Sequence, residues 1–503
     1  MKRYVLVVTA LTVGLAAFGA SGNAATKPAA GPTPTPIPSP RVTALPYPAY
    51  GTPAPDVART VRAPGVPQLV NLQQAIDIAA AKSPLLAQAR ANETIANANV
   101  KLARAPALPS VGVVGSSTHS NTSGGASLGG STGGGAFGNN GSTGGRSGSG
   151  GSFTSNSLDA NLKQLIFDGG RVSAQIRAAS ENEQGTADTY RRQLQTVAFN
   201  VANAYYNALA AGRTVAIDAE LVRENQVSAD LVAAQVRAGT EARAQIATAE
   251  LPVAQARVNL VRAQGAEYSA LATFVNALGL DANVDVRPVD DTPSNPSATL
   301  LQPELLSYDA AMARAALLRP DLAAAQRTIN AAEETLHAAR LGKVPTVNGS
   351  AGLGVASTLP DGSNFNHSGN IGATITIPIF DQGLTAAQTE QAQGQLENAR
   401  ANFENTRLGV GLNVRQALTN LVSAQAALVQ TQAELRNARQ VLQSTQAQYR
   451  AGVTTLPLLL NAEVGLTQAE TDNVNAIYAL RQAEQNYLFA LGENDTQIPA
   501  GYK

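Results

Sequence analysis

Two similar halves make up this chain, and this internal duplication restricts the possible folds more than any other feature of the sequence. Residues 72–109 align with 308–345, and residues 167–279 align without a gap with 380–492. Uncommon residues recur in the same order in both halves: Pro109 and Pro345, Phe-Asp-x-Gly at 167–170 and 380–383, and Arg-Ala-Gly at 237–239 and 450–452. Chance similarity between alanine-rich helices does not reproduce this order, so we expect two structurally equivalent halves.

Each half predicts the same run of elements: a helix, two strands, a long helix and a shorter helix. In the first half, residues 68–280, we expect strands at about 107–120 and 153–167 and a helical hairpin at 170–279. In the second half, residues 306–492, we expect strands at about 345–358 and 367–380 and a hairpin at 383–491. The first half also holds a Gly/Ser-rich stretch at 121–152, which cannot bury enough apolar surface to offset its ordering entropy and is expected to be a flexible loop.

The long helices carry an apolar seam whose steps alternate between three and four residues. Its members are Leu194, Val197, Val201, Ala204, Ala208, Ala211 and Val215 in one half, and Val410, Val414, Ala417, Leu421, Ala424 and Leu428 in the other. A mean step of 3.5 residues is typical of a left-handed coiled coil. Because about 65 helical residues make a rod on the order of 100 Å long, these helices cannot lie inside one compact domain. Gly239 and Gly452 can take the left-handed conformation that ends a helix, so each rod is expected to turn back as a hairpin.

The segments between the helices alternate between apolar and small polar residues, most clearly in the second half. Apolar residues stand at Val347, Ala351, Leu353 and Val355, and at Ile371, Ala373, Ile375, Ile377 and Ile379. One apolar and one polar face over about ten residues is the pattern of a lipid-facing barrel wall. Four strands cannot close a barrel, since the smallest membrane barrels have about eight, so this interpretation requires an oligomer. The alternative is an ordinary soluble antiparallel sheet.

The N-terminus predicts export from the cytoplasm. Lys2 and Arg3 precede an apolar run from Tyr4 to Phe18 and then small residues, which is typical of a secretory signal peptide at 1–24; a membrane anchor is the alternative. A proline-rich stretch at 25–67 predicts a disordered leader. We expect residues 281–305 to be a linker and 493–503 a C-terminal tail.

Composition excludes several classes of function. The 36 basic and 36 acidic residues cancel, which argues against a nucleic-acid partner. There is no cysteine for a thiol, disulfide, lipid or thiolate metal site. The only histidines, His119, His337 and His367, stand without an evident acid and nucleophile nearby. We therefore expect neither an enzyme nor a cofactor or metal site.

The sequence resembles the TolC-like outer-membrane efflux protein family over about residues 68–492. The resemblance rests on the duplicated halves, the proline before each pair of strands, the Phe-Asp-x-Gly motif after it, and the glycine in each hairpin turn. The resemblance implies a mainly α fold with membrane β-strands: long coiled-coil hairpins forming a periplasmic tunnel, plus four strands contributed to a trimeric 12-stranded outer-membrane barrel. It also implies a homotrimer in contact with outer-membrane lipid that passively exports cargo. An inner-membrane pump or secretion ATPase would deliver that cargo through a periplasmic adaptor, as in tripartite efflux or type I secretion. Residues 281–305 and those after 492 would then belong to a belt around the tunnel.

The same resemblance implies two functional regions. The hairpin tips would dock the adaptor, which selects Arg237, Gly239, Thr240, Arg450, Gly452 and Val453; the alternative is that these glycines only end helices. The periplasmic entrance would be lined by Thr454, Leu458 and Asn461, where Leu458 and Asn461 replace the acids often found in the family. Glu241 and Glu463, the nearest acids, are expected to be solvated helix charges.

A secreted coiled-coil adhesin, or a periplasmic adaptor without a pore, is the other function that fits long helical rods. The alternating strands favour the channel, because an adhesin has no use for an apolar outer sheet face. Cargo is not encoded in any motif that we recognise, since its choice would rest with the pump and the adaptor.

Overall fold

The computed structural model describes residues 68–121, 152–290, 307–359 and 365–494. Several expected segments lie outside these residues: the signal peptide at 1–24, the proline-rich leader at 25–67, most of the Gly/Ser-rich loop at 121–152, much of the 281–305 linker, and nearly all of the tail at 493–503.

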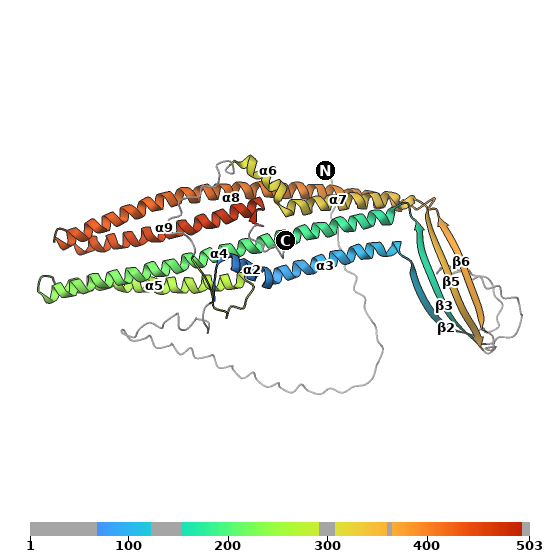
Figure 1. Cartoon of the computed structure of the whole chain (residues 1–503), viewed down its shortest axis with the longest axis horizontal. Coiled ribbons are helices and arrows are strands. Elements are labelled where there is room, and N and C mark those ends of the chain that lie inside the picture. Colours follow the sequence, from blue (N-terminus) through green and yellow to red (C-terminus); the bar gives the residue numbers. More distant parts are fainter. Residues whose placement is uncertain (1–67, 122–151, 291–306, 360–364, 495–503) are drawn as a thin grey trace, which may run out of the picture. The chain divides into compact units, whose positions relative to one another are not determined.

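Apart from two short strands in the first half, both halves contain the same succession of helices and strands, as the duplication predicts (Figure 1). The first half comprises β1 (Gln68–Val70), α2 (Leu72–Lys82), α3 (Pro84–Arg104), η1 (Ala105–Ala107), β2 (Ser110–Asn121), β3 (Ser152–Phe167), α4 (Arg171–Arg237), α5 (Ala244–Ala277) and β4 (Val286–Pro288). The second comprises α6 (Tyr308–Leu318), α7 (Pro320–Arg340), η3 (Leu341–Lys343), β5 (Thr346–Leu359), β6 (Asn366–Thr376), α8 (Leu384–Arg450) and α9 (Leu456–Leu491).

The single helix expected before each pair of strands is in fact two helices. The chain is extended at Ser83, with ψ 123°, and at Arg319, with ψ 118°. A proline follows each of these residues, and its ring disfavours the helical conformation of the residue before it. Pro84 and Pro320 then open α3 and α7, because proline is well suited to the first position of a helix.

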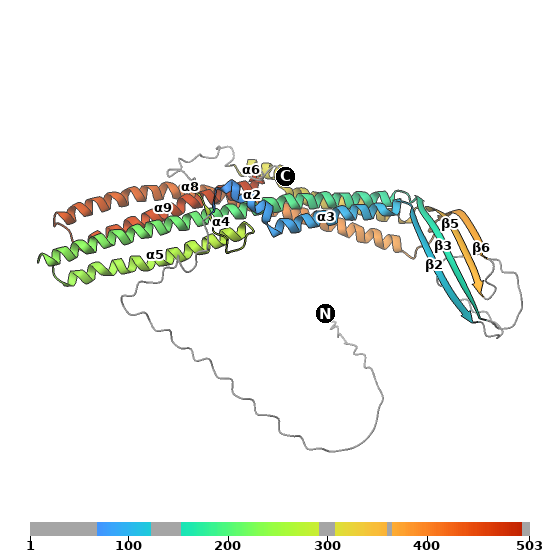
Figure 2. The same ribbon diagram turned by 60° about the horizontal axis from the view of Figure 1, so that its bottom comes forward.

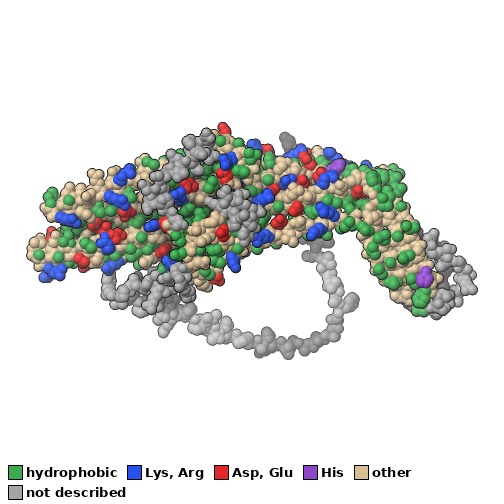
Figure 3. All heavy atoms as spheres, in the orientation of Figure 1, with side chains coloured by type: hydrophobic (Ala, Val, Ile, Leu, Met, Phe, Trp, Pro, Cys, Tyr) green, Lys and Arg blue, Asp and Glu red, His purple; other side chains and the backbone are tan. Residues whose placement is uncertain are grey.

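Strands β2, β3, β5 and β6 form one antiparallel sheet in that order, so the β3–β5 pair joins the two halves. The apolar side chains of one face are exposed, including Val111, Leu353 and Ile371, the last of which is 90% exposed. Figure 3 shows hydrophobic side chains over the sheet and charged ones over the helices. Within the described residues, β2 and β6 each lack a partner strand on their outer edge.

The last strand ends earlier than its sequence pattern indicates. Alternation predicts a strand to residue 380, but β6 ends at Thr376, which pairs with Thr346 at the beginning of β5. Pro378 follows and has no N–H to donate to a ladder. The apolar residues Ile377, Ile379 and Phe380 therefore stand outside the sheet and are exposed.

An aspartate in each Phe-Asp-x-Gly motif holds the beginning of a long helix. Asp168 accepts hydrogen bonds from the backbone N–H of Gly170, at 2.9 Å, and of Val172, at 2.6 Å. Asp381 does the same for Gly383, at 3.3 Å, and Thr385, at 2.9 Å. The first N–H groups of a helix have no partner inside it, so these carboxylates stabilise the points where the strands pass into α4 and α8.

Most of the predicted seam residues are buried in the core between the helices, while Ala211, Val215 and Ala424 are half-buried. Leu194, Val197 and Val201 of α4 are buried together with α2 and α5, while Val410, Val414 and Leu421 of α8 are buried with α6 and α9. In Figures 1 and 2 the α4–α5 and α8–α9 hairpins lie beside each other, and their turns are at the end of the helices away from the sheet. Small seam residues such as Ala204 and Ala417 are also buried, which fits close helix packing.

A second, two-stranded sheet joins the beginning of the first half to residues 281–305, the segment expected to be a linker and part of a belt around the tunnel. Strand β1 pairs in parallel with β4, and the segment that follows β4 is fastened to the helices. Tyr205 donates a hydrogen bond to the carbonyl oxygen of Val289. Asp290 accepts hydrogen bonds from Arg213 on α4 and from Tyr478 on α9, both at 2.8 Å. These contacts connect the two hairpins midway along the long helices.

Candidate functional site

The two hairpin turns have the same backbone geometry. Gly239 and Gly452 have positive φ angles of 79° and 70°. In each turn the residue after the glycine donates its N–H to a carbonyl five residues earlier: Thr240 to Gln235 at 3.0 Å, and Val453 to Gln448 at 2.9 Å. Nothing lies within 4 Å of a Cβ built on either glycine, so the left-handed backbone, rather than close packing, explains the glycine.

The predicted docking side chains surround these turns and are accessible. Arg237, Thr240, Arg450 and Val453 are all exposed, and Val453 is 77% exposed. Arg237 and Arg450 each end a long helix, where a positive charge complements the partial negative charge of the last carbonyl groups. Each tip therefore offers a helix-ending arginine and a hydroxyl or apolar side chain to a partner, and the first turn also exposes Arg243.

An apolar cluster and a hydrogen bond hold the hairpins together just above the tips. The cluster joins Val232 of α4 and Val253 of α5 to Leu456 and Leu460 of α9. Tyr449 donates a hydrogen bond of 3.4 Å to the side chain of Gln235. The two tips are thus coupled within one chain.

The predicted entrance residues do not take part in this contact. Leu458 and Asn461 are exposed on α9, while Leu456 and Leu460 are buried against the first hairpin. Thr454 is half-buried in the turn before α9. Asn461 instead lines an open groove of about 600 Å³ between α8 and α9, together with Asn437 and Val441.

The expectation that Glu463 is a solvated helix charge is wrong. Glu463 is 3% exposed and lies between the hairpins, where Ser228 of α4 donates a hydrogen bond of 3.1 Å to Oε1. Its Oε2 has no hydrogen-bond partner within the described residues. Burial raises the pKa of Glu463, the Ser228 hydrogen bond partly offsets this rise, and the nearby Glu224 adds to it. Glu241 is exposed, as expected.

The spacing of α9 contained a signal for this site. Leu459, Leu460 and Glu463 lie three, four and seven residues after Leu456, which is one face of a helix, and all four are buried. Glu463 therefore continues the apolar stripe of the helix. A carboxylate at such a position indicates a buried polar contact rather than a solvated face.

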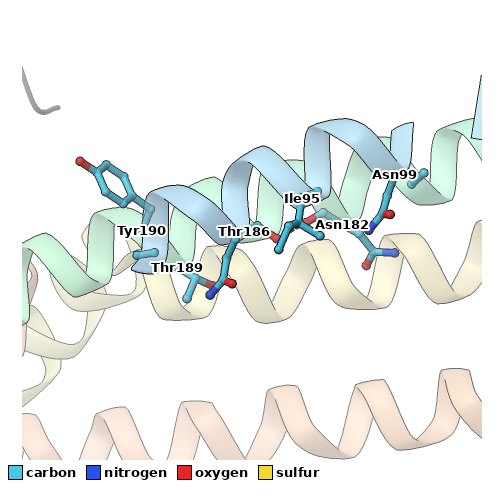
Figure 4. Close-up of a pocket in the computed structure, with 10 residues that line it drawn as sticks. Ile95, Asn99, Asn182, Thr186, Thr189 and Tyr190 are labelled. Atoms are coloured by element: carbon cyan, nitrogen blue, oxygen red, sulfur yellow. Dashed lines mark hydrogen bonds between the residues drawn. The ribbon is translucent and has the colours of Figure 1, made fainter. Parts of the chain in front are cut away.

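The hollows of the surface are open, and they differ in charge: one of about 430 Å³ is lined by charged side chains that include Arg213, Asp290 and Glu470. A groove of about 580 Å³ between α3 and α4 is lined by amides, hydroxyls and small apolar side chains, including Asn99, Asn182 and Thr186 (Figure 4). It contains no charged residue. Nowhere in the described part of the chain do three His, Cys, Asp or Glu residues gather as metal ligands would.

The histidines are dispersed over separate elements, on β2, α7 and β6. His119 Nδ1 lies 2.9 Å from the Thr154 hydroxyl on the neighbouring strand.

Of the helices that the structure describes, none combines the length and the apolarity needed to cross a membrane.

Comparison with known proteins assigns the chain to a family. The model of the family described as "Outer membrane efflux protein" matches residues 75–280 and 311–493. Protein CyaE of Bordetella pertussis is 28% identical over 428 residues, which is 84% of either chain. Outer membrane protein TolC of Escherichia coli K12 is 26% identical over 462 residues, covering 86% of this chain and 84% of TolC.

The fold agrees with that of solved channels. The crystal structure of CusC superposes with a TM-score of 0.70 at 22% identity, covering 84% of this chain and 92% of CusC. The two segments that match the family model correspond to the two halves of the duplication and together span well over half of the sequence. The chain therefore belongs to the outer membrane efflux protein family, the TolC-like outer membrane factors.

Proposed function

We propose that three copies of this chain form the outer-membrane channel of a tripartite export system. As a member of its family, the chain is an outer-membrane efflux protein, and its relatives are channel proteins rather than enzymes. The proposal adds the homotrimer, with twelve strands in a barrel and twelve helices in a periplasmic tunnel. It also adds a periplasmic adaptor and an inner-membrane pump or ATPase that deliver the cargo for passive export.

The observation that carries this proposal is a four-stranded sheet with an exposed apolar face and two open edges. An apolar face of this extent is unfavourable in water and favourable in contact with lipid. Backbone N–H and C=O groups cannot remain unpaired in a bilayer, so β2 and β6 need partner strands from other copies of the chain. Three sheets of four strands satisfy both requirements.

The helices extend the same duct below the sheet. Each long helix follows a strand of the sheet in the sequence, α4 after β3 and α8 after β6, and continues to a hairpin tip. A passive conduit needs a continuous wall more than an enclosed ligand pocket, and the open grooves fit that role. The exposed tips, with Arg237 and Arg450, are the surface that we assign to the adaptor.

Cysteine cross-linking and conductance test the proposal together. The natural sequence has no cysteine, so a Ser116→Cys, Ser368→Cys protein has one thiol on β2 and one on β6. Two strands separate these positions within a chain, beyond the ~7 Å that a disulfide can bridge between Cα atoms. We expect oxidation, scanned over neighbouring positions to find the register, to give a ladder that ends at three chains.

Purified protein in a planar bilayer should conduct ions, and its particles should have threefold symmetry. Absence of both conductance and cross-linked trimers would reject the channel. The adhesin or pore-free adaptor alternative predicts this negative result, but neither accounts for the exposed apolar face of the sheet.

A further inference from the structure

The four strands of the sheet contain only two charged residues, Asp159 and Lys163, and both lie on β3. Successive strand residues point to opposite faces, so these two, four residues apart, share one face. It is the polar face, since Leu158, Ala160 and Leu162 alternate with them on the other. In the proposed barrel this face lines the bore.

The neighbours of Asp159 are arranged around its carboxylate. Across the sheet, Asp159 is opposite Val114 on one side and Gly354 on the other, and Gly354 is opposite Ser368. A Cβ added to Gly354 would lie 2.5 Å from Asp159 Oδ1 and 2.7 Å from the Ser368 hydroxyl. The carboxylate therefore extends over the bare backbone of Gly354 toward β6. Its other oxygen accepts a hydrogen bond of 3.0 Å from Ser157.

Lys163 is exposed and lies between Ser110 and Ser350 in the register of the sheet. When the 213-residue offset of residues 167–279 is extended back into the strands, Gly372 and Thr376 of β6 stand opposite Asp159 and Lys163 in the alignment. The equivalent strand of the second half thus forms without either charge. A strand of this kind therefore does not require the two charges, and a role in the bore accounts for them.

We infer that Asp159 and Lys163 form two rings of opposite charge that set the ion selectivity of the bore, which rests on the trimeric channel proposed above. The rings are separated by roughly 13 Å along the strand, or roughly 10 Å along the axis of a barrel with strands tilted by about 40°. At physiological salt the screening length is about 8 Å, so each ring acts mainly on its own stretch of the bore. Cargo arriving from the helices meets the lysines first and the aspartates next, because β3 ends beside α4. The two rings offset each other, which leaves the wild-type bore with little preference for either sign.

Reversal potentials in a KCl gradient test the inference in single variants. Asp159→Asn should lower the cation-to-anion permeability ratio by about twofold, and Lys163→Gln should raise it by a similar factor. The double variant should return close to the wild-type ratio. All shifts should shrink at 1 M salt, where the screening length is about 3 Å.

Two variants serve as controls. Asn161→Ser lies between the rings on the same face, changes no charge, and should leave the ratio unaltered. Asp159→Glu keeps the charge and should behave as the wild type, which separates charge from damage to the strand. Shifts of the same sign in Asp159→Asn and Lys163→Gln, or none in a conducting channel, would overturn the charged rings. A wild-type protein that does not conduct at all would instead overturn the proposed function.

Discussion

The Ser228 hydroxyl of α4 donates a hydrogen bond to the Glu463 carboxylate of α9, and this contact joins the two hairpins through a buried acid. The Glu463 side chain has one oxygen paired and one without a hydrogen-bond partner in the described structure. A buried carboxylate is costly when ionised, and Glu224 on the same face of α4 adds repulsion. The contact between the hairpins therefore depends on the protonation of Glu463.

Glu463→Gln should raise the thermal stability of the protein at neutral pH. The pKa of Glu463 is raised in the folded state, so the acid contributes stability that is fully present below the unfolded pKa of about 4.5 and is lost as pH rises through the folded pKa. Glutamine keeps an acceptor for Ser228 without the charge. We expect a gain of about 1 kcal/mol at pH 7 and a flatter dependence of Tm on pH above 4.5.

Glu241→Gln is the matched control, since this acid is exposed and close to the same end of the molecule. It should leave Tm and its pH dependence nearly unchanged. An equal effect of the two substitutions, measured by circular dichroism in detergent, would contradict the assignment of the pH response to Glu463.

The sequence predicts the parts of the fold that repeat or alternate. The seam around Val201 and Val414 was recoverable because a 3.5-residue period persists over many turns, and the strand faces because residues such as Ile371 and Ile375 alternate. Strands β1 and β4 are not predictable from the sequence, because three residues are too few to show the two-residue alternation of a strand. The trimer and the partners rest on resemblance, because no residue pattern within one chain identifies its neighbours.

Contacts that occur in only one half are harder to predict from a duplicated sequence. Arg319 and Asp321 align with Ser83 and Leu85, which are uncharged, so comparison of the two halves does not predict an ion pair at this position. The structure shows that Arg319 donates to Asp321 and, at 3.1 Å, to the carbonyl oxygen of Ala490. Burial and the charge of Arg319 lower the pKa of the neighbouring Arg192 to about 10. Two arginines and one aspartate thus connect α4, α7 and α9.

Asp321→Asn should destabilise the fold by about 3 kcal/mol, because it leaves the buried Arg319 guanidinium without its counter-charge. Burial alone would raise the pKa of Asp321, but the hydrogen bond and charge of Arg319 outweigh it and lower the pKa overall. Denaturant unfolding measures the loss. Asp309→Asn, at an exposed position in the first turn of α6, should cost no more than about 0.5 kcal/mol. Equal losses would show that the network contributes nothing of its own.

Asp381→Asn should remove an acid-sensitive component of stability. Hydrogen bonds from Thr385, with help from Gly383 and the charge of Lys343, lower the pKa of Asp381 to about 2. This carboxylate therefore contributes stability that is present above its unfolded pKa of about 3.8 and is lost as pH falls through about 2. In an acid titration followed by circular dichroism, the variant should have a lower Tm at neutral pH and a shallower decline between pH 4 and 2. Asp230→Asn, at an exposed position on α4, is the control and should leave the decline unaltered. An unaltered decline in Asp381→Asn would contradict the proposed role of Asp381.

Arg450→Glu should weaken binding to the periplasmic adaptor without altering insertion into the outer membrane. Arg450 is exposed in the last turn of α8, directly before the Gly452 turn, so reversing its charge changes the tip surface and leaves the hairpin core in place. We expect at least a tenfold loss in adaptor pull-down, which corresponds to about 1.4 kcal/mol. Arg436→Glu makes the same charge change on an exposed part of α8 away from the tip and should bind normally. If both variants lose binding equally, overall charge rather than the tip controls docking; if neither does, the tip is not the docking surface.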